Sequence, residues 1–159
     1  MILPRQNTHH LLVAMAHLAE NVPLTVLDCG GRFDSSVVAR AAHGRKEIID
    51  RIKVQRAFIC SEAVRLVEQT SAENAPVVIL DFLSTFYDEN VRINMRKFLL
   101  ERSLQHFQKL SRGAGLAVMV HPPPASPDSL YFFRRLQACA SQVSRYELSA
   151  PDSRQLSLF

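Results

Sequence analysis

The sequence lacks a run of apolar residues long enough to cross a membrane, although 47% of its 159 residues are hydrophobic. Its first residues do not follow the pattern of a secretory signal peptide, because Pro4, Arg5, His9 and His10 interrupt the apolar start. It also has no internal repeat and no low-complexity tract. These absences argue against membrane, secreted and repeat proteins, and we expect one globular domain with its own hydrophobic core.

Cysteine is scarce, and no pair of cysteines has the spacing of a structural zinc site. The three residues, Cys29, Cys60 and Cys139, are an odd number and lie far apart in the sequence. We therefore expect free thiols, a cytoplasmic location and no membrane contact. The net charge of +4 and the isoelectric point near 9.3 permit contact with nucleic acid but do not require it.

Short β-branched runs alternate with longer stretches in which apolar residues recur at helical spacing. The expected strands are residues 24–27, 52–58, 77–80 and 116–120, with a last one at 143–148. The expected helices include residues 8–20, 61–69, 89–111 and 129–140, with a short helix after Asp34. In the helix at 89–111 we expect these side chains to face inward: Phe98, Leu100, Leu104, Phe107 and Leu110. The alternation predicts an α/β fold with a mostly parallel central sheet.

The run from Val77 to Leu80 is apolar and mostly β-branched, begins after Pro76 and is followed by Asp81. Such a run is typical of a strand buried on both faces in the middle of a parallel sheet. A carboxylate directly after it lies at the edge where α/β proteins bind ligands. In P-loop proteins that hydrolyse nucleotides, the same pattern is the Walker B strand, whose Asp helps to hold Mg²⁺. Taken alone, the pattern more often marks an ordinary buried strand that ends in a polar turn.

Taken in chain order, three segments resemble the ATPase core of the RecA/RadA family. Residues 24–34 are similar to the family strand that ends in an IDTEGRFD-type turn, and residues 52–58 are similar to its ILVARAF-type strand. Residues 77–87 are similar to the Walker B strand and the residues after it. The resemblance covers roughly residues 8–121 and implies a three-layer RecA-like P-loop fold, with helices on both faces of the sheet.

The family's phosphate-binding loop has the pattern G-x-x-x-x-G-K-S/T, and this chain departs from it. If Thr8 is aligned with the Ser/Thr of the motif, Asn7 occupies the position of the Lys, Gln6 that of the second Gly and Met1 that of the first. The resemblance therefore implies a degenerate loop, without the glycines that wrap a phosphate and without the cation that binds it.

Two further positions of the family's site also differ. Gly30 stands where the family has the Glu that prepares the attacking water, and His121, followed by Pro122, stands where it has a polar sensor of the γ-phosphate. Thr8 and Asp81 are then the remnants of a nucleotide site. We therefore expect no enzyme activity, no cofactor and no metal ion. A composite nucleotide site completed by another subunit is the alternative.

The last five residues resemble the bacterial sliding-clamp-binding pentapeptide, whose consensus is QLSLF or QLDLF. They are Gln155, Leu156, Ser157, Leu158 and Phe159. The resemblance implies a clamp-binding site on a flexible tail at residues 150–159, after a RecA-like domain at residues 1–149. Leu158 and Phe159 would enter an apolar pocket on the clamp. The alternative is a tail that folds back over the domain's own core.

Two groups of basic residues are candidate nucleic-acid contacts. The first group is Arg45, Lys46, Arg51 and Lys53, and the second is Arg134 with Arg135. Acidic residues are mixed with the first group, so a solvated surface is the alternative there. The second group follows Tyr131 and two phenylalanines, which ordinary helix packing explains equally well.

The resemblance implies an accessory protein of bacterial DNA repair, recombination, the SOS response or damage-tolerant DNA synthesis. In general plan it is similar to the ImuA and SulA group of RecA-related proteins. It would act through protein contacts with the sliding clamp, with other repair or recombination proteins and within RecA-like homo- or hetero-oligomers, and direct DNA binding would be weak. Two alternatives stay open: a SulA-like inhibitor of a filament-forming partner, and a weak nucleotide-binding ATPase subunit of a mixed oligomer.

Overall fold

The computed structural model describes residues 8–71, 75–113 and 115–143. Among these described residues, four strands form one sheet in the order β2-β1-β3-β4, and every neighbouring pair is parallel. The strands are β1 (Leu24–Asp28), β2 (Ile52–Arg56), β3 (Val77–Leu80) and β4 (Leu116–Val118). The predicted α/β fold with a parallel sheet is therefore confirmed.

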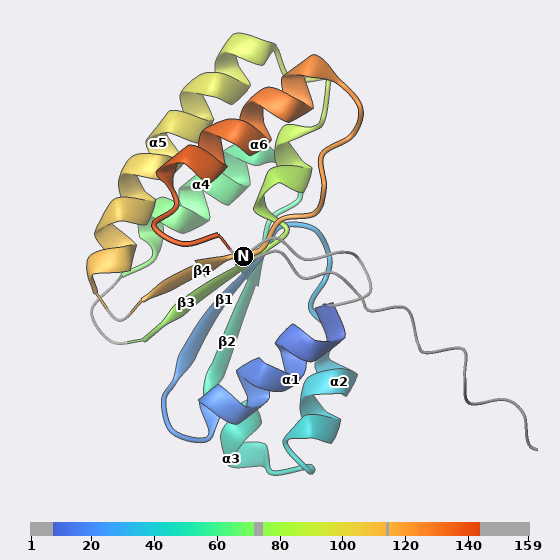
Figure 1. Ribbon diagram of the computed structural model, residues 1–159. Coiled ribbons are helices and arrows are strands. Elements are labelled where there is room, and N and C mark those ends of the chain that lie inside the picture. The colour runs from blue at the N-terminus through green and yellow to red at the C-terminus, as the bar shows by residue number, and fades with distance from the viewer. Residues whose placement is uncertain (1–7, 72–74, 114, 144–159) are drawn as a thin grey trace, which may run out of the picture.

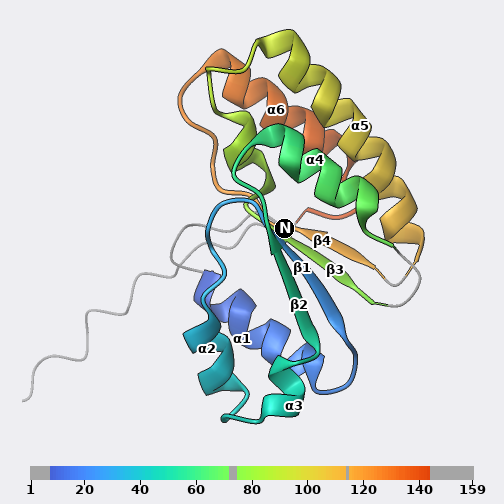
Figure 2. The same cartoon turned by 180° about the vertical axis from the view of Figure 1, so that it is seen from behind.

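Helices cover both faces of the sheet (Figures 1 and 2). On one face lie α1 (Thr8–Ala19), α2 (Ser35–Ala41) and α3 (Lys46–Ile49). On the other face lie α4 (Cys60–Gln69), the 3₁₀ helix η2 (Phe82–Phe86), α5 (Ile93–Arg112) and α6 (Pro127–Cys139). No described helix is long and apolar enough to span a bilayer.

The strand β3 contributes to a hydrophobic core on each face of the sheet, because successive side chains of a strand point to opposite faces. Val78 and Leu80 pack in the core with α1 and α2, whereas Val77 and Ile79 pack in the core with α4, α5 and α6. All four side chains are buried, which explains why the strand is a continuous apolar run. In the second core the Phe82 ring lies 5.0 Å from the rings of Phe86 and Phe107.

Several boundaries differ from the sequence-based prediction. The strand predicted at 52–58 ends at Arg56, the one predicted at 116–120 ends at Val118, and the helix predicted from residue 89 begins at Ile93. The strand predicted at 143–148 and the tail at 150–159 lie outside the described residues, except for Val143. The helix η2 was not predicted, whereas the short helix α2 follows Asp34, whose carboxylate accepts the Ser36 N–H at 2.8 Å.

The prediction that Phe98 faces inward is wrong. Its ring is 57% exposed, whereas Leu99 and Leu100 are buried. Residues two apart on an α-helix point about 200° apart, so Phe98 and Leu100 cannot share one face of α5. The other four predicted inward side chains are buried.

Candidate functional site

The site lies where the direction of chain connection changes. The chain passes from β1 outward to β2 along one face of the sheet, and it returns to β3 through α4 on the other face. The carboxyl ends of β1 and β3 are therefore the topological switch point at which open α/β sheets bind ligands. Asp28 ends β1 and Asp81 directly follows β3, and both side chains are buried.

Asp81 is held by two basic side chains from separate loops. Its Oδ2 lies 3.0 Å from Arg32 Nε, in the loop after β1, and its Oδ1 lies 2.9 Å from His121 Nδ1, in the loop after β4. The histidine contact is close but poorly aligned for a hydrogen bond, and His121 Nε2 has no hydrogen-bond partner among the described residues. Asp81 itself has a left-handed backbone, with φ of 54°. We call Asp81, Arg32 and His121 the rim ion cluster.

The charge on Asp81 is favoured in the folded protein. Burial by itself would raise the pKa of this carboxyl, but the contacts with His121 and Arg32 outweigh burial and hold the pKa below its usual value. The carboxylate is therefore ionised and already neutralised by the protein's own side chains. A divalent cation at this position would have to displace Arg32, His121 or both.

Asp28 shapes the loop that carries Arg32. Its carboxylate accepts the backbone N–H of Arg32 at 2.8 Å and that of Phe33 at 3.1 Å. Arg56 Nε lies 3.2 Å from Asp28 Oδ2, and the Arg56 guanidinium also donates to the Phe33 carbonyl at 3.1 Å. Asp28 therefore holds the shape of this loop, and Arg56 is its cationic partner.

Gly30 lies directly against Asp81. A Cβ atom added to Gly30 would be 2.5 Å from Asp81 Oδ2 and 2.6 Å from Asp81 Cβ, which are both far inside van der Waals contact. The Ser84 hydroxyl reinforces this approach, because its Oγ lies 2.8 Å from the carbonyl oxygens of both Cys29 and Asp81. At the position where the resemblance expects a Glu, there is no room for a side chain in this arrangement.

The Cys29 thiol and the Tyr87 hydroxyl, which both feel the charge of Asp81, are not activated as nucleophiles. Burial, with the charges of Asp28 and Asp81, raises the pKa of the Cys29 thiol to about 12. Burial and the charge of Asp81 also raise the pKa of Tyr87, whose hydroxyl has no hydrogen-bond partner among the described residues. Both groups therefore stay protonated at neutral pH. Within the described ranges, no three His, Cys, Asp or Glu side chains are grouped so that they could hold a metal ion.

Thr8 is the first residue of α1 and is buried. Because α1 leads into the start of β1, its first turn lies toward the carboxyl edge of the sheet (Figure 1). The residues that would form the phosphate-binding loop precede it and lie outside the described part of the chain, as do all five residues of the terminal pentapeptide.

In the first basic group, two of the four residues make contacts within the protein. Arg45 pairs with Glu20 at 2.9 Å, and Arg51 donates to the Glu20 carbonyl at 2.6 Å. Lys46 and Lys53 are exposed.

The second basic group is also divided. Arg134 is exposed on α6, whereas Arg135 pairs with Glu101 at 2.7 Å. The two groups cannot form one continuous surface, because α6 and α3 lie on opposite faces of the sheet (Figure 1).

Sequence reasoning missed the partners of Asp81. Arg32 was not singled out, and His121 was noted only as a departure from the family pattern. The signal was present in the order of elements, since both residues follow strands whose carboxyl ends lie on the edge that carries Asp81.

Replacing Asp81 with Asn is expected to destabilise the protein by about 2 kcal/mol at pH 7, because Arg32 and His121 lose their anionic partner. Asn tolerates the left-handed backbone, so the change isolates the charge. Since folding lowers the pKa of Asp81, its contribution is present above about pH 4 and is lost as the pH falls below that value. Urea unfolding from pH 7 to pH 3 should show the two proteins converging in acid. Parallel curves at a constant separation would contradict this role.

A scan against protein-family models finds no match, and a search of curated proteins finds none either.

Proposed function

We propose that this protein is a RecA-like accessory protein of bacterial DNA repair, recombination or damage-tolerant DNA synthesis, which acts through protein contacts and does not hydrolyse nucleotide. The observation that carries the proposal is the rim ion cluster. Asp81 follows an interior strand, as a Walker B carboxylate does, yet Arg32 and His121 contact it where a nucleotide hydrolase would hold Mg²⁺. Four parallel strands between two helical layers, with Asp81 at the end of an interior strand, agree with such a fold.

Exposed apolar side chains support a role in protein contacts. Phe58 and Ile59, just before α4, are 78% and 46% exposed, and Met95 and Phe98 on α5 are 52% and 57% exposed. We call these four residues the α4–α5 patch. Large exposed apolar groups that gather on one surface mark interaction sites.

Helix geometry places the members of the α4–α5 patch close together along the two helices. Both helices follow a strand of the parallel sheet and precede the next, so they run in the same direction. The hydrogen bond from Arg102 on α5 to Glu68 on α4 shows which residues of the two helices lie side by side. Met95 precedes Arg102 by seven residues, and Ser61 precedes Glu68 by the same number. Because the two helices are parallel and rise equally per residue, Met95 lies beside Ser61, which is close to Ile59 in the sequence.

The outer edge of β2 supports an oligomer with RecA-like subunits. The Arg51 carbonyl and the Ala57 N–H bond to β1, so the backbone groups of the alternate residues 52, 54 and 56 point away from the sheet. Within the described part of the chain, no strand pairs with this edge. An open parallel edge beside the exposed Phe58 ring can accept a strand from another subunit.

The clamp-binding part of the proposal predicts that removing Gln155–Phe159 lowers the affinity for a purified bacterial sliding clamp by at least about 100-fold. The reason is that the peptide supplies the two apolar anchors, Leu158 and Phe159, and hot spots of this kind carry most of the binding energy. Isothermal titration calorimetry would measure both chains. Arg154→Ala is the matched control in the same tail and should bind normally. Equal affinity of the full and shortened chains would refute the tether.

The second candidate, a SulA-like inhibitor of a filament-forming partner, is favoured by the α4–α5 patch alone. It predicts that cells overproducing the chain filament whether or not the last five residues are present. Replacing Phe98 with Ser should then abolish filamentation, because the patch would be the inhibitory surface. If neither chain causes filamentation, this candidate is excluded.

A further inference from the structure

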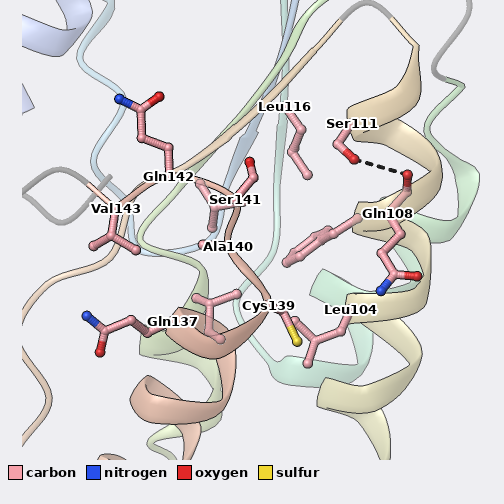
Figure 3. A pocket seen from close by; sticks show the side chains of 13 residues that line it. Leu104, Gln108, Ser111, Leu116, Gln137, Cys139, Ala140, Ser141, Gln142 and Val143 are labelled. Atoms are coloured by element: carbon pink, nitrogen blue, oxygen red, sulfur yellow. Dashed lines mark hydrogen bonds between the residues drawn. The ribbon is translucent and has the colours of Figure 1, made fainter.

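A cavity opens beside β4, and none of the residues that line it belongs to the rim ion cluster. Its volume is about 190 Å³, and it lies between β4, the second half of α5 and the end of α6 (Figure 3). Its inner wall is apolar and includes Leu104, Phe107 and Leu136, which belong to the hydrophobic core. The polar atoms at its mouth come from uncharged side chains such as Gln108, Ser111 and Gln137. A cavity of this size accepts a group as large as a phenyl ring.

The chain itself runs along this cavity. Residues 140–143, directly after α6, form part of its lining, and residues 144–159 follow them in the sequence. None of the described residues that line the cavity is charged. Between residues 144 and 154 the sequence has four charged side chains, whereas Gln155–Phe159 has none and offers three large apolar side chains. The terminal pentapeptide therefore matches the cavity in polarity.

We propose that Gln155–Phe159 docks into this cavity of its own chain, with Leu158 or Phe159 in the apolar interior and Gln155 and Ser157 at the polar mouth. The connection is long enough, since the stretch from Val143 to Gln155 spans up to about 40 Å when extended. An attached peptide has an effective concentration in the millimolar range, so even weak docking keeps much of it bound.

Docking would regulate the tail. The same apolar side chains cannot occupy the cavity and a pocket on the clamp at the same time. Docking therefore lowers the apparent affinity for the clamp, in proportion to the fraction of molecules whose tail is docked. This consequence rests on the proposed function, whereas the docking itself does not. A free peptide of the tail sequence should therefore bind the clamp about two- to fivefold more tightly than the full chain does.

Cys139 provides a test with a native probe. It is exposed and lines the cavity, whereas Cys29 and Cys60 are buried. We expect a thiol reagent such as DTNB to modify Cys139 at least about fivefold faster in a chain that ends at Arg154 than in the full chain. Replacing Leu158 and Phe159 together with Ser should give the same increase without shortening the chain. Cys139→Ser reports the background from the other thiols.

Equal labelling rates in the full, shortened and doubly substituted chains would overturn the proposal. A rate that rises only when residues 144–159 or Met1–Leu3 are removed would also overturn it, because another segment would then cover the cavity. The proposed function is judged separately by the clamp titration. If Cys139 is labelled faster in the shortened chain but the full chain does not bind the clamp, docking is supported and the clamp tether is rejected. If the full chain binds the clamp but the labelling rate is unchanged, the tether is supported and docking is rejected.

Discussion

Replacing Gly30 with Ala is expected to lower the free energy of unfolding by about 3 kcal/mol, the upper end of the cost of overpacking a rigid site. The new methyl group would lie 2.5 Å from Asp81 Oδ2 and 2.6 Å from Asp81 Cβ. Relief requires movement of the Asp81 backbone, since Cβ is not the end of a flexible side chain. That movement would separate Asp81 from Arg32 and His121. Urea unfolding at pH 7 measures the loss.

Gly31 is the matched control. Its φ is +63°, and no atom of the described part of the chain lies within 4 Å of a Cβ added there, so Gly31→Ala costs only backbone strain of about 1 kcal/mol. The contact can also be isolated with a double-mutant cycle, because Asp81→Gly removes the clashing atoms and tolerates a positive φ. The cost of Gly30→Ala should then shrink in the Asp81→Gly background. Equal costs for Gly30→Ala and Gly31→Ala would contradict a close approach at the rim.

Replacing Arg96 with Met is expected to destabilise the protein by about 2 to 3 kcal/mol. Arg96 is 4% exposed, and its guanidinium donates to the Phe86 carbonyl at 2.9 Å. It also contacts Asp128 at 3.4 Å and lies 5.4 Å from the centre of the Phe132 ring. The side chain therefore connects η2, α5 and α6, and Met keeps the apolar stem while it removes these polar contacts. Thermal and urea unfolding would both report the loss.

Two controls separate the burial of Arg96 from its charge. Arg92 precedes α5, is exposed and makes no side-chain cap, so Arg92→Met should change stability by less than about 0.5 kcal/mol. Asp128 is half-exposed, so Asp128→Asn should cost less than about 1 kcal/mol. If Asp128→Asn costs as much as Arg96→Met, the ion pair and not the carbonyl contact dominates, contrary to our account.

The sequence predicted those elements whose burial or capping produces a recognisable pattern in residues that are neighbours in the sequence. The continuous apolar run Val77–Leu80 could be recognised because both faces of β3 are covered, and Asp34 could be recognised because a cap acts within one turn. The edge on which Asp81 lies followed from the parallel order of strands.

The composition of the rim ion cluster could not be predicted in the same way. Arg32 is 49 residues from Asp81 in the sequence, and their contact depends on the loop shape that Asp28 fixes through two backbone N–H groups. The orientation of Phe98 was missed for a different reason. Hydrophobicity alone suggested burial, whereas the helical phase set by Leu100 turns the ring outward.

We propose that the protein's own side chains close the rim of the sheet, so that it does not bind nucleotide. Thermal unfolding with and without millimolar Mg·ATP tests this most directly, because a ligand at 100 times its dissociation constant stabilises a fold by about 2.7 kcal/mol and raises its Tm by several degrees. We expect a Tm that is unchanged within about 1 °C. A Mg²⁺-dependent rise of several degrees that Asp81→Asn abolishes would contradict it.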